Sequence, residues 1–341
     1  MILGRRTTWL ETTPVEAGAL QKMPFYEQRS PDLRKQSAVC TYVAGSPPLA
    51  SWHRRPARLQ WPVRMTSDRV LGAILGLVAG DRNGGPQRFA LRLARSLVAL
   101  RRFDPGDVLG RYLEWWRSGA FDTGPTAAHV FQLIEQGVTP ERAARLVHEA
   151  SGGQTAGVGP AHRVTPLGAL PIVPAGELLQ AARREARLTH WHPLAGWVAG
   201  AVALLIRRLV AGQELEAALE ASERDVARAA ASEADRRAAV VVEILGAALR
   251  RELAVERAGA GGYAPETFAA ALAFVIRYDA SFEVALERSI AFAGGANYAP
   301  VLVGAIAGAR AGASAIPQRM LRHERDIVRE FRRLVAEESA R

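Results

Sequence analysis

The sequence predicts an all-α fold, and three observations support that class. Apolar residues recur at spacings of three and four through most of the chain after Met65, which is the period of a helix buried along one face. Almost no segment shows the period of two that marks a strand, and no repeat of fixed length indicates a solenoid. With 341 residues and 49% hydrophobic content, the chain can bury a substantial core.

The first helix is expected to begin at Ser67, whose hydroxyl can cap it, with Asp68 at its positive end. Glycine recurs every four residues over 72–80 and again over 304–312. Each series forms a helix ridge without side chains, which allows another backbone to approach closely. We therefore expect the helices at these two ends of the domain to pack against each other.

Further amphipathic helices are expected between these two and after them. The last one, near 317–338, would start with Pro317 in its first turn and place Leu321, Phe331 and Leu334 on one side. The expected ranges of the others are 88–102, 105–118, 125–136, 139–150, 174–186, 193–211, 213–230, 232–252, 264–278 and 281–293.

Residues 1–64 differ from the rest of the chain. They hold seven of the nineteen prolines, ten Lys or Arg against four Asp or Glu, and no sustained helical or strand period. We expect either a disordered extension or a misassigned start, with the folded domain covering residues 65–341. If the extension has a function, it is a basic arm that binds an acidic partner or an organellar targeting peptide.

The net charge of +10 comes largely from that extension, because the remaining residues hold 34 basic against 30 acidic side chains. A nearly neutral folded body does not favour nucleic-acid binding. Cys40 is the single cysteine, which excludes an intrachain disulfide and fits a cytoplasmic protein. The apolar runs 70–80 and 194–206 are shorter than the ~20 residues that span a bilayer, so no membrane helix is expected.

The sequence lacks a phosphate loop, HExxH, GxSxG and paired CxxC, and the remaining candidates are glycine-rich junctions. In the first junction, 80–86, Asp81 could accept hydrogen bonds from sugar hydroxyls; the alternative is a helix stop with a glycine turn. In the second, 112–126, Asp122 could line a site or cap the next helix.

Two further junctions carry basic groups. Gly157 and Gly159 precede Arg163, so backbone N–H groups and a guanidinium could meet a phosphate, although a plain interhelical loop fits equally well. His190 and His192 could ligate a metal, but a helix cap and a packed ring are the favoured interpretation because no third ligand is nearby.

The last two junctions open helices with a Gly-Gly pair, at 261–262 and 294–295. Such a turn exposes unpaired N–H groups, which suits a ligand or an ion. Asn297 and Tyr298 follow the second pair and are therefore candidate ligand-binding residues.

These six segments, in this order, resemble the ADP-ribosylglycohydrolase family from Asp68 to Leu321. The turn 80–86 is similar to that family's GDALGAP turn, 157–168 to its GNGALMRIAPIG loop, and 188–193 to its LTHPHP. The resemblance implies a compact, orthogonal multi-helix domain. It also implies cleavage of the glycosidic bond between ADP-ribose and a side chain with two Mg²⁺ or Mn²⁺ ions.

The chain departs from this family where those ions would bind. The family's Thr-Asp-Asp-Thr motif falls on four positions without a carboxylate, and Ala or Tyr replaces each principal residue of its Asp-x-Asp-Thr motif. The residues at these positions are Gly84, Gly85, Pro86, Gln87, Ala296, Tyr298 and Ala299. A divalent ion wants about six oxygen ligands, so neither a dinuclear metal site nor any other cofactor is expected.

The leading hypothesis is a family member that has lost metal-dependent hydrolysis and binds ADP-ribose, a related nucleotide or an ADP-ribosylated protein. The alternative is a working glycohydrolase in which Asp81 or Asp122 acts as a general base on water. A third interpretation is a helical protein that only binds partners, with Tyr298 closing the cleft.

Overall fold

The structure is a computed structural model that describes residues 67–255 and 261–340, and within these it is helical without a strand. The all-α prediction is confirmed, whereas the expectations for residues 1–64 lie outside the described residues. The α-helices are α2 (Ser67–Gly80), α3 (Gly85–Leu100), α4 (Pro105–Arg117), α5 (Pro125–Glu135), α6 (Pro140–Ala150), α7 (Gly159–Arg163), α8 (Thr165–Ala169), α9 (Ala175–Ala186), α10 (Pro193–Val210), α11 (Leu215–Glu233), α12 (Ala239–Leu249), α13 (Ala264–Arg277), α14 (Phe282–Ala293), α15 (Tyr298–Ala311) and α16 (Arg325–Ser339).

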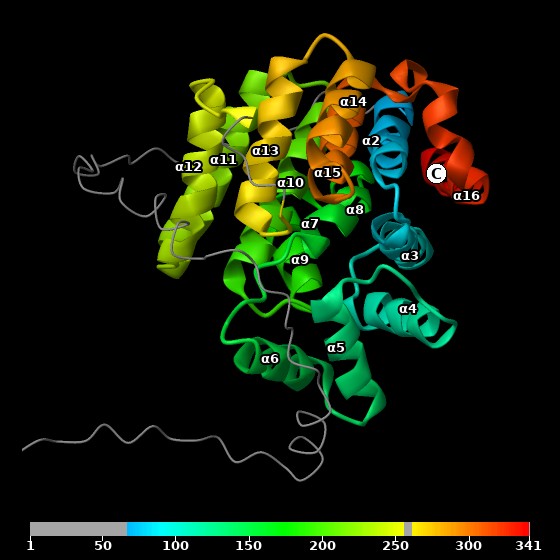
Figure 1. Cartoon of the computed structure of the whole chain (residues 1–341), viewed down its shortest axis with the longest axis vertical. Helices are drawn as coiled ribbons and strands as arrows, with labels where there is room; N and C mark the ends of the chain where they lie inside the picture. Colours follow the sequence, from blue (N-terminus) through cyan, green and yellow to red (C-terminus); the bar gives the residue numbers. More distant parts are fainter. Residues whose placement is uncertain (1–66, 256–260, 341) are drawn as a thin grey trace, which may run out of the picture. The chain divides into compact units, whose positions relative to one another are not determined.

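Helix α10 forms the centre of the core, with α9, α11, α13 and α15 packed around it (Figure 1). It is the one described helix with the length and apolarity to cross a membrane, and 94% of it is buried inside the protein. That burial is typical of a core helix.

The two glycine-ridged helices, α2 and α15, pack directly against each other, as predicted (Figure 1). A Cβ atom on Gly76 would lie 2.0 Å from the carbonyl oxygen of Gly304, and one on Gly72 would lie 2.3 Å from that of Gly308. Only hydrogen at these positions lets the two backbones touch. The contact positions the turn that follows α2 beside the turn that precedes α15.

A buried guanidinium holds the short helix α8 and the loop after it against α10. Arg207 lies within α10 and donates four hydrogen bonds of 2.6–3.0 Å to backbone carbonyls at Leu167, Gly168, Leu170 and Val173. Burial lowers its pKa to about 10. These carbonyls lie at and just beyond the end of α8, where the helix dipole is negative and favours a cation. Within residues 67–255 and 261–340, no carboxylate pairs with Arg207.

Three expected elements differ from the structure. The last helix does not begin at Pro317, because a 3₁₀ segment (Gln318–Glu324) comes first and Glu324 leaves the helical conformation. The expected break between 230 and 232 falls at Ala234, whose left-handed φ of 53° ends α11. The loop expected over 157–168 folds instead into the short helices α7 and α8.

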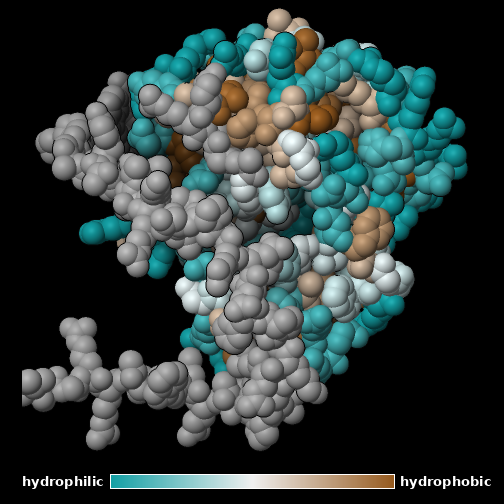
Figure 2. Space-filling view, in the orientation of Figure 1, coloured by the Kyte–Doolittle hydropathy of each residue, from teal (hydrophilic) through white to brown (hydrophobic). Residues whose placement is uncertain are grey.

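Helix α16 presents a strongly amphipathic surface. Phe331, Leu334 and Val335 are buried against the domain, while arginine and glutamate side chains cover the outside. Hydrophilic residues accordingly cover the side of the molecule where α16 lies (Figure 2). This helix, together with the 3₁₀ segment before it, lies beside α2 and α3.

Candidate functional site

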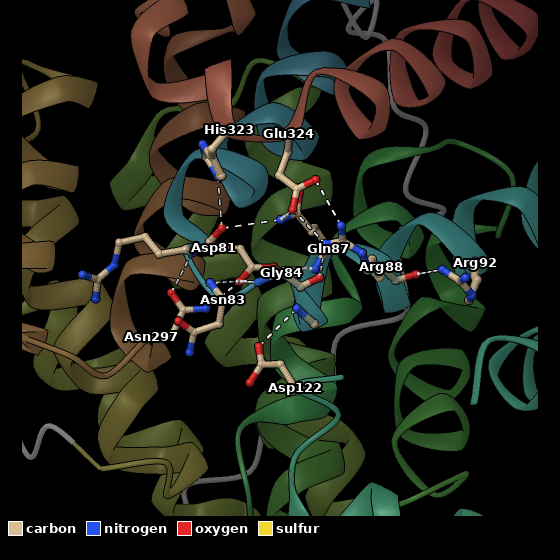
Figure 3. Close-up of polar contacts among 12 residues, drawn as sticks. Asp81, Asn83, Gly84, Gln87, Arg88, Arg92, Asp122, Asn297, His323 and Glu324 are labelled. Atoms are coloured by element: carbon tan, nitrogen blue, oxygen red, sulfur yellow. Dashed lines mark hydrogen bonds and ion pairs between the residues drawn. The ribbon is translucent and has the colours of Figure 1, made fainter. Parts of the chain in front are cut away.

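Asp81 organises the turn between α2 and α3. Its carboxylate is fully buried and accepts hydrogen bonds from the backbone N–H groups of Asn83 (3.2 Å), Gly84 (2.9 Å) and Gln87 (2.9 Å) (Figure 3). These bonds satisfy donors at the start of α3 that have no partner within the helix. The turn thus ends α2 and caps the start of α3, and Gly84 in it has a left-handed φ of 97°, which agrees with the alternative of a helix stop with a glycine turn.

Asn297 joins this turn to the one before α15. Its amide Nδ2 donates to Asp81 Oδ1 at 2.6 Å, and its Oδ1 accepts from the backbone N–H of Arg82 at 3.1 Å. The guanidinium of Arg82 also donates to the carbonyl oxygen of Gly294 at 2.8 Å. Two predicted junctions more than 200 residues apart in the chain therefore meet at one buried carboxylate (Figure 3).

The environment of Asp81 leaves it little capacity for a ligand. Burial raises its pKa, while hydrogen bonds from Gln87, Gly84 and Asn297 act in the opposite direction. Three internal donors share its Oδ1, the N–H of Gln87 binds its Oδ2, and the whole residue is buried. The geometry disfavours the predicted contact between Asp81 and a sugar hydroxyl.

Asp122 reaches the same turn from the loop between α4 and α5. Its Oδ2 accepts from the backbone N–H of Gly85 at 3.1 Å (Figure 3), and its own backbone has a left-handed φ of 51°. A Cβ on Gly85 would lie 1.9 Å from the Asp122 carbonyl oxygen, so this close approach requires glycine. Partial burial of the carboxyl raises the pKa of Asp122, although the residue is exposed.

Arg163 points into the interior. Its guanidinium is 1% exposed, pairs with Glu185 at 2.6 Å and donates to Thr189 Oγ1 at 2.8 Å. The rings of Phe89 and Tyr112 lie 5.1 and 5.2 Å from it, and the Tyr112 hydroxyl also donates to Glu185. With its cation enclosed and paired, Arg163 holds helices together, and the geometry disfavours the predicted phosphate contact.

The two histidines of the 188–193 segment have separate structural roles. Burial lowers the pKa of His190 well below its ordinary value, and its Nδ1 lies 2.8 Å from Thr189 Oγ1. His192 caps α10 by accepting from the N–H of Leu194 at 3.2 Å. The favoured interpretation, a cap and a packed ring, describes both residues.

Gly157 and Gly159 lie against the His190 ring. Cβ atoms on these glycines would lie 3.1 Å and 3.4 Å from ring atoms of the histidine. An antiparallel bridge connects Gly157 to Tyr263, just before α13. The junctions at 157–168, 188–193 and 261–262 therefore lie together. None of these contacts involves the Asp81 turn.

Tyr298 stands at the edge of both groups with 41% of its surface exposed. Its ring covers Gly262, where a Cβ atom would lie 2.9 Å away, and its backbone carbonyl accepts from His162 Nε2 at 2.8 Å. Burial lowers the pKa of His162 to about 4, so the ring is neutral and fixes the start of α15. Sequence reasoning did not single out His162.

Sequence reasoning also missed an ion pair above the Asp81 turn. Arg88 on α3 pairs with Glu324 at 2.8 Å, Gln87 donates to the same carboxylate, and His323 Nε2 lies 3.3 Å from the Asp81 carbonyl oxygen (Figure 3). No pattern in the sequence links positions 88 and 324, because the contact depends on how the C-terminal segment lies on α3.

The residues present do not fit a centre of two divalent ions. The seven positions that would supply ligands in the family hold no carboxylate. Of the three carboxylates nearby, Asp81 and Asp122 bind backbone N–H groups and Glu324 pairs with Arg88. Within residues 67–255 and 261–340, no three His, Cys, Asp or Glu side chains are grouped to hold a metal ion. The Arg88 guanidinium lies 2.5 Å from where a Cβ on Gly84 would be, so a cation of the protein already occupies this region.

A cavity of about 370 Å³ lies elsewhere, near the ends of α13 and α15, and none of the predicted site residues lines it. Tyr278, Phe282 and Arg310 are among the residues of its wall. The cavity and the cluster of junctions are therefore different features of the molecule.

The helical architecture is that of the ADP-ribosylglycohydrolase class, to which a solved structure with the same fold belongs. The family model for ADP-ribosylglycohydrolase matches residues 88–341, and the chain belongs to that family. It is 24% identical over 307 residues to an ADP-ribosyl-[dinitrogen reductase] glycohydrolase from Rhodospirillum rubrum, which covers 79% of this chain and 94% of the relative. A solved ADP-ribosylglycohydrolase-related protein complex contains a chain with 28% identity and a TM-score of 0.59, covering 80% of this chain and 97% of that one.

Proposed function

We propose that this protein is a member of the family without metal-dependent hydrolysis, which binds ADP-ribose or a related nucleotide. One observation supports it. The turn that carries Gly84–Gln87 and the turn that carries Ala296–Ala299 are joined through Asp81 and Asn297, so both losses of carboxylates fall on one location. In this proposal the ligand is free ADP-ribose or an ADP-ribosylated protein in the cytoplasm.

Isothermal titration calorimetry with ADP-ribose, with and without Mg²⁺, tests the proposal. The expected result is binding with the same affinity in both buffers, because no cluster of carboxylates would take up the ion. Absence of binding at millimolar ADP-ribose would remove the nucleotide from the proposal. An affinity for ADP-ribose that depends on Mg²⁺ would refute the proposal that the protein binds its ligand without a metal ion.

A second candidate function, glycosidic hydrolysis by altered chemistry, rests on Asp122. This residue combines a backbone conformation that non-glycine residues rarely adopt with a carboxyl whose pKa is raised by burial, and both are common in catalytic groups. Among the described residues, nothing donates a hydrogen bond to its Oδ1, so that oxygen could take a proton from water.

An assay of ADP-ribose release from ADP-ribosylated arginine and serine peptides separates the two functions. Turnover in the wild-type protein that Asp122→Asn abolishes, with ADP-ribose affinity retained, would establish hydrolysis. A wild-type protein that binds ADP-ribose and releases none supports the binding function.

A further inference from the structure

We propose that Arg88 binds an anionic group of the ligand. In the free protein the Glu324 carboxylate pairs with Arg88, and a phosphate or diphosphate of the ligand displaces it. This inference rests on the proposed function for the identity of the nucleotide and names the part of it that is recognised. The class of ligand is a molecule with a phosphate or diphosphate group.

Three donors converge on the Glu324 carboxylate from one side of α3. Arg88 forms a two-pronged contact, with Nη1 2.8 Å from Oε1 and Nη2 3.2 Å from Oε2. Gln87 Nε2 adds a third donor at 3.2 Å from Oε1. A guanidinium fork fits a phosphate as well as a carboxylate, so these residues form a preformed anion receptor that the protein itself fills.

The receptor lies at the surface of the junction cluster, where solvent reaches part of both side chains. The side chains of Arg88 and Glu324 are 22% and 17% exposed. Gly84 allows the guanidinium to approach the backbone closely, since a Cβ there would lie 2.5 Å from Arg88 Nη1 and 3.3 Å from Glu324 Oε1. Phe121, half exposed, lies with its ring 4.7 Å from the guanidinium and offers an apolar surface to the rest of a ligand.

The charges around Arg88 permit the exchange. Asp122 is the nearby carboxylate that opposes a second anion, and the N–H of Gly85 at the positive end of α3 already binds its Oδ2. One turn further along α3, Arg92 donates to the Arg88 carbonyl oxygen and stacks on Trp115, and no described carboxylate pairs with it. Displacement of Glu324 therefore leaves an incoming anion beside the Arg88 guanidinium, with a second arginine one turn further along α3.

The C-terminal segment can release Glu324 without leaving the domain. Glu324 is the last residue of the 3₁₀ segment, and α16 is held separately on α3 by the ion pair of Arg95 with Glu330 at 3.1 Å. Movement at Glu324 alone is enough to open the receptor. The second ion pair also provides a matched control, because it joins α3 to the same C-terminal part of the chain, away from the site.

Calorimetric titration of the full chain with inorganic diphosphate and, separately, with ADP-ribose tests the proposal in Glu324→Gln, Arg88→Met and Glu330→Gln. We expect Glu324→Gln to bind diphosphate about fivefold more tightly than the wild type, since a partly exposed ion pair is no longer broken. Arg88→Met should lose the binding, and Glu330→Gln should match the wild type.

Each other outcome decides a separate point. Unchanged diphosphate affinity in Glu324→Gln overturns the proposal. A gain in affinity in Glu330→Gln equal to that in Glu324→Gln also overturns it, because loosening of α16 would then explain the effect. If diphosphate binds with the expected pattern and ADP-ribose does not bind, the Arg88 receptor is retained and the proposed function is refuted. If neither Glu324→Gln nor Arg88→Met changes the affinity for ADP-ribose, the proposed function is retained and the Arg88 receptor is refuted.

Discussion

Replacing Gly76 by alanine would force the two glycine-ridged helices apart. The new Cβ atom would lie 2.0 Å from the Gly304 carbonyl oxygen and 2.7 Å from its carbon, where ordinary contact begins at 3.4 Å. Both obstructing atoms belong to the backbone, so α2 and α15 must separate by more than about 1 Å and lose van der Waals contact along their length. No side-chain rotation can relieve the clash.

Overpacking of this kind costs about 3 kcal/mol. Alanine regains about 1 kcal/mol because it favours a helix over glycine, which leaves a net loss of about 2 kcal/mol in the free energy of unfolding. For a domain of this size, that loss lowers the melting temperature by about 3–4 °C. Urea unfolding followed by far-ultraviolet circular dichroism measures it directly, as a lower midpoint with an unchanged slope.

Gly110→Ala is the matched control. Gly110 lies inside α4, is exposed and has no atom within 4 Å of its Cβ position, so the same substitution should stabilise the protein by about 0.5–1 kcal/mol. If Gly76→Ala proved as stable as the wild type or as Gly110→Ala, the close packing of α2 and α15 would be refuted.

Three further predictions concern buried polar groups. Arg207→Met should lower the free energy of unfolding by at least about 3 kcal/mol, because four buried carbonyls lose their donor, and Arg207→Lys should lose less; urea midpoints compare them. Since the pKa of His162 falls from 6.5 to about 4 on folding, the unfolded state binds more protons between these values and stability decreases as pH falls through this range. His162→Gln should reduce that loss, which amounts to about 3 kcal/mol, in urea titrations at pH 7 and pH 4; an equal loss in both proteins would contradict it. Asn297→Ala should cost about 2 kcal/mol in thermal melts because Asp81 loses a buried donor, whereas Asn83→Ala, an exposed neighbour, should change little.

The sequence was sufficient for the helical class and for the pairing of α2 with α15, because both depend on regular spacing. Glycines at four-residue intervals have one main physical use in two helices, which is close backbone contact. The start of α16 was not predictable from Pro317. Favourable local propensity for a helix turn there is overridden by Glu324, which leaves helical geometry and pairs with Arg88 on another helix.

The candidate site was predictable in part. Asp81 and Asn297, both candidate ligand-binding residues, do meet through a hydrogen bond. The orientation of Arg163 was not predictable, because a basic residue after two glycines has the same local pattern whether it faces solvent or a buried glutamate. Its partner Glu185 comes from α9, and only the packing of that helix decides the direction.

The contact between α2 and α15 also has a consequence for the order in which the domain folds. Its paired glycines are about 230 residues apart in the chain, so during synthesis α2 emerges long before the surface that covers it exists. Contacts of such sequence separation form late and slow the overall rate, and the apolar face of α2 stays uncovered until then. A ribosome-bound chain that stops before α15 should consequently be protease-sensitive and prone to aggregate, while one extended beyond α15 can close its core.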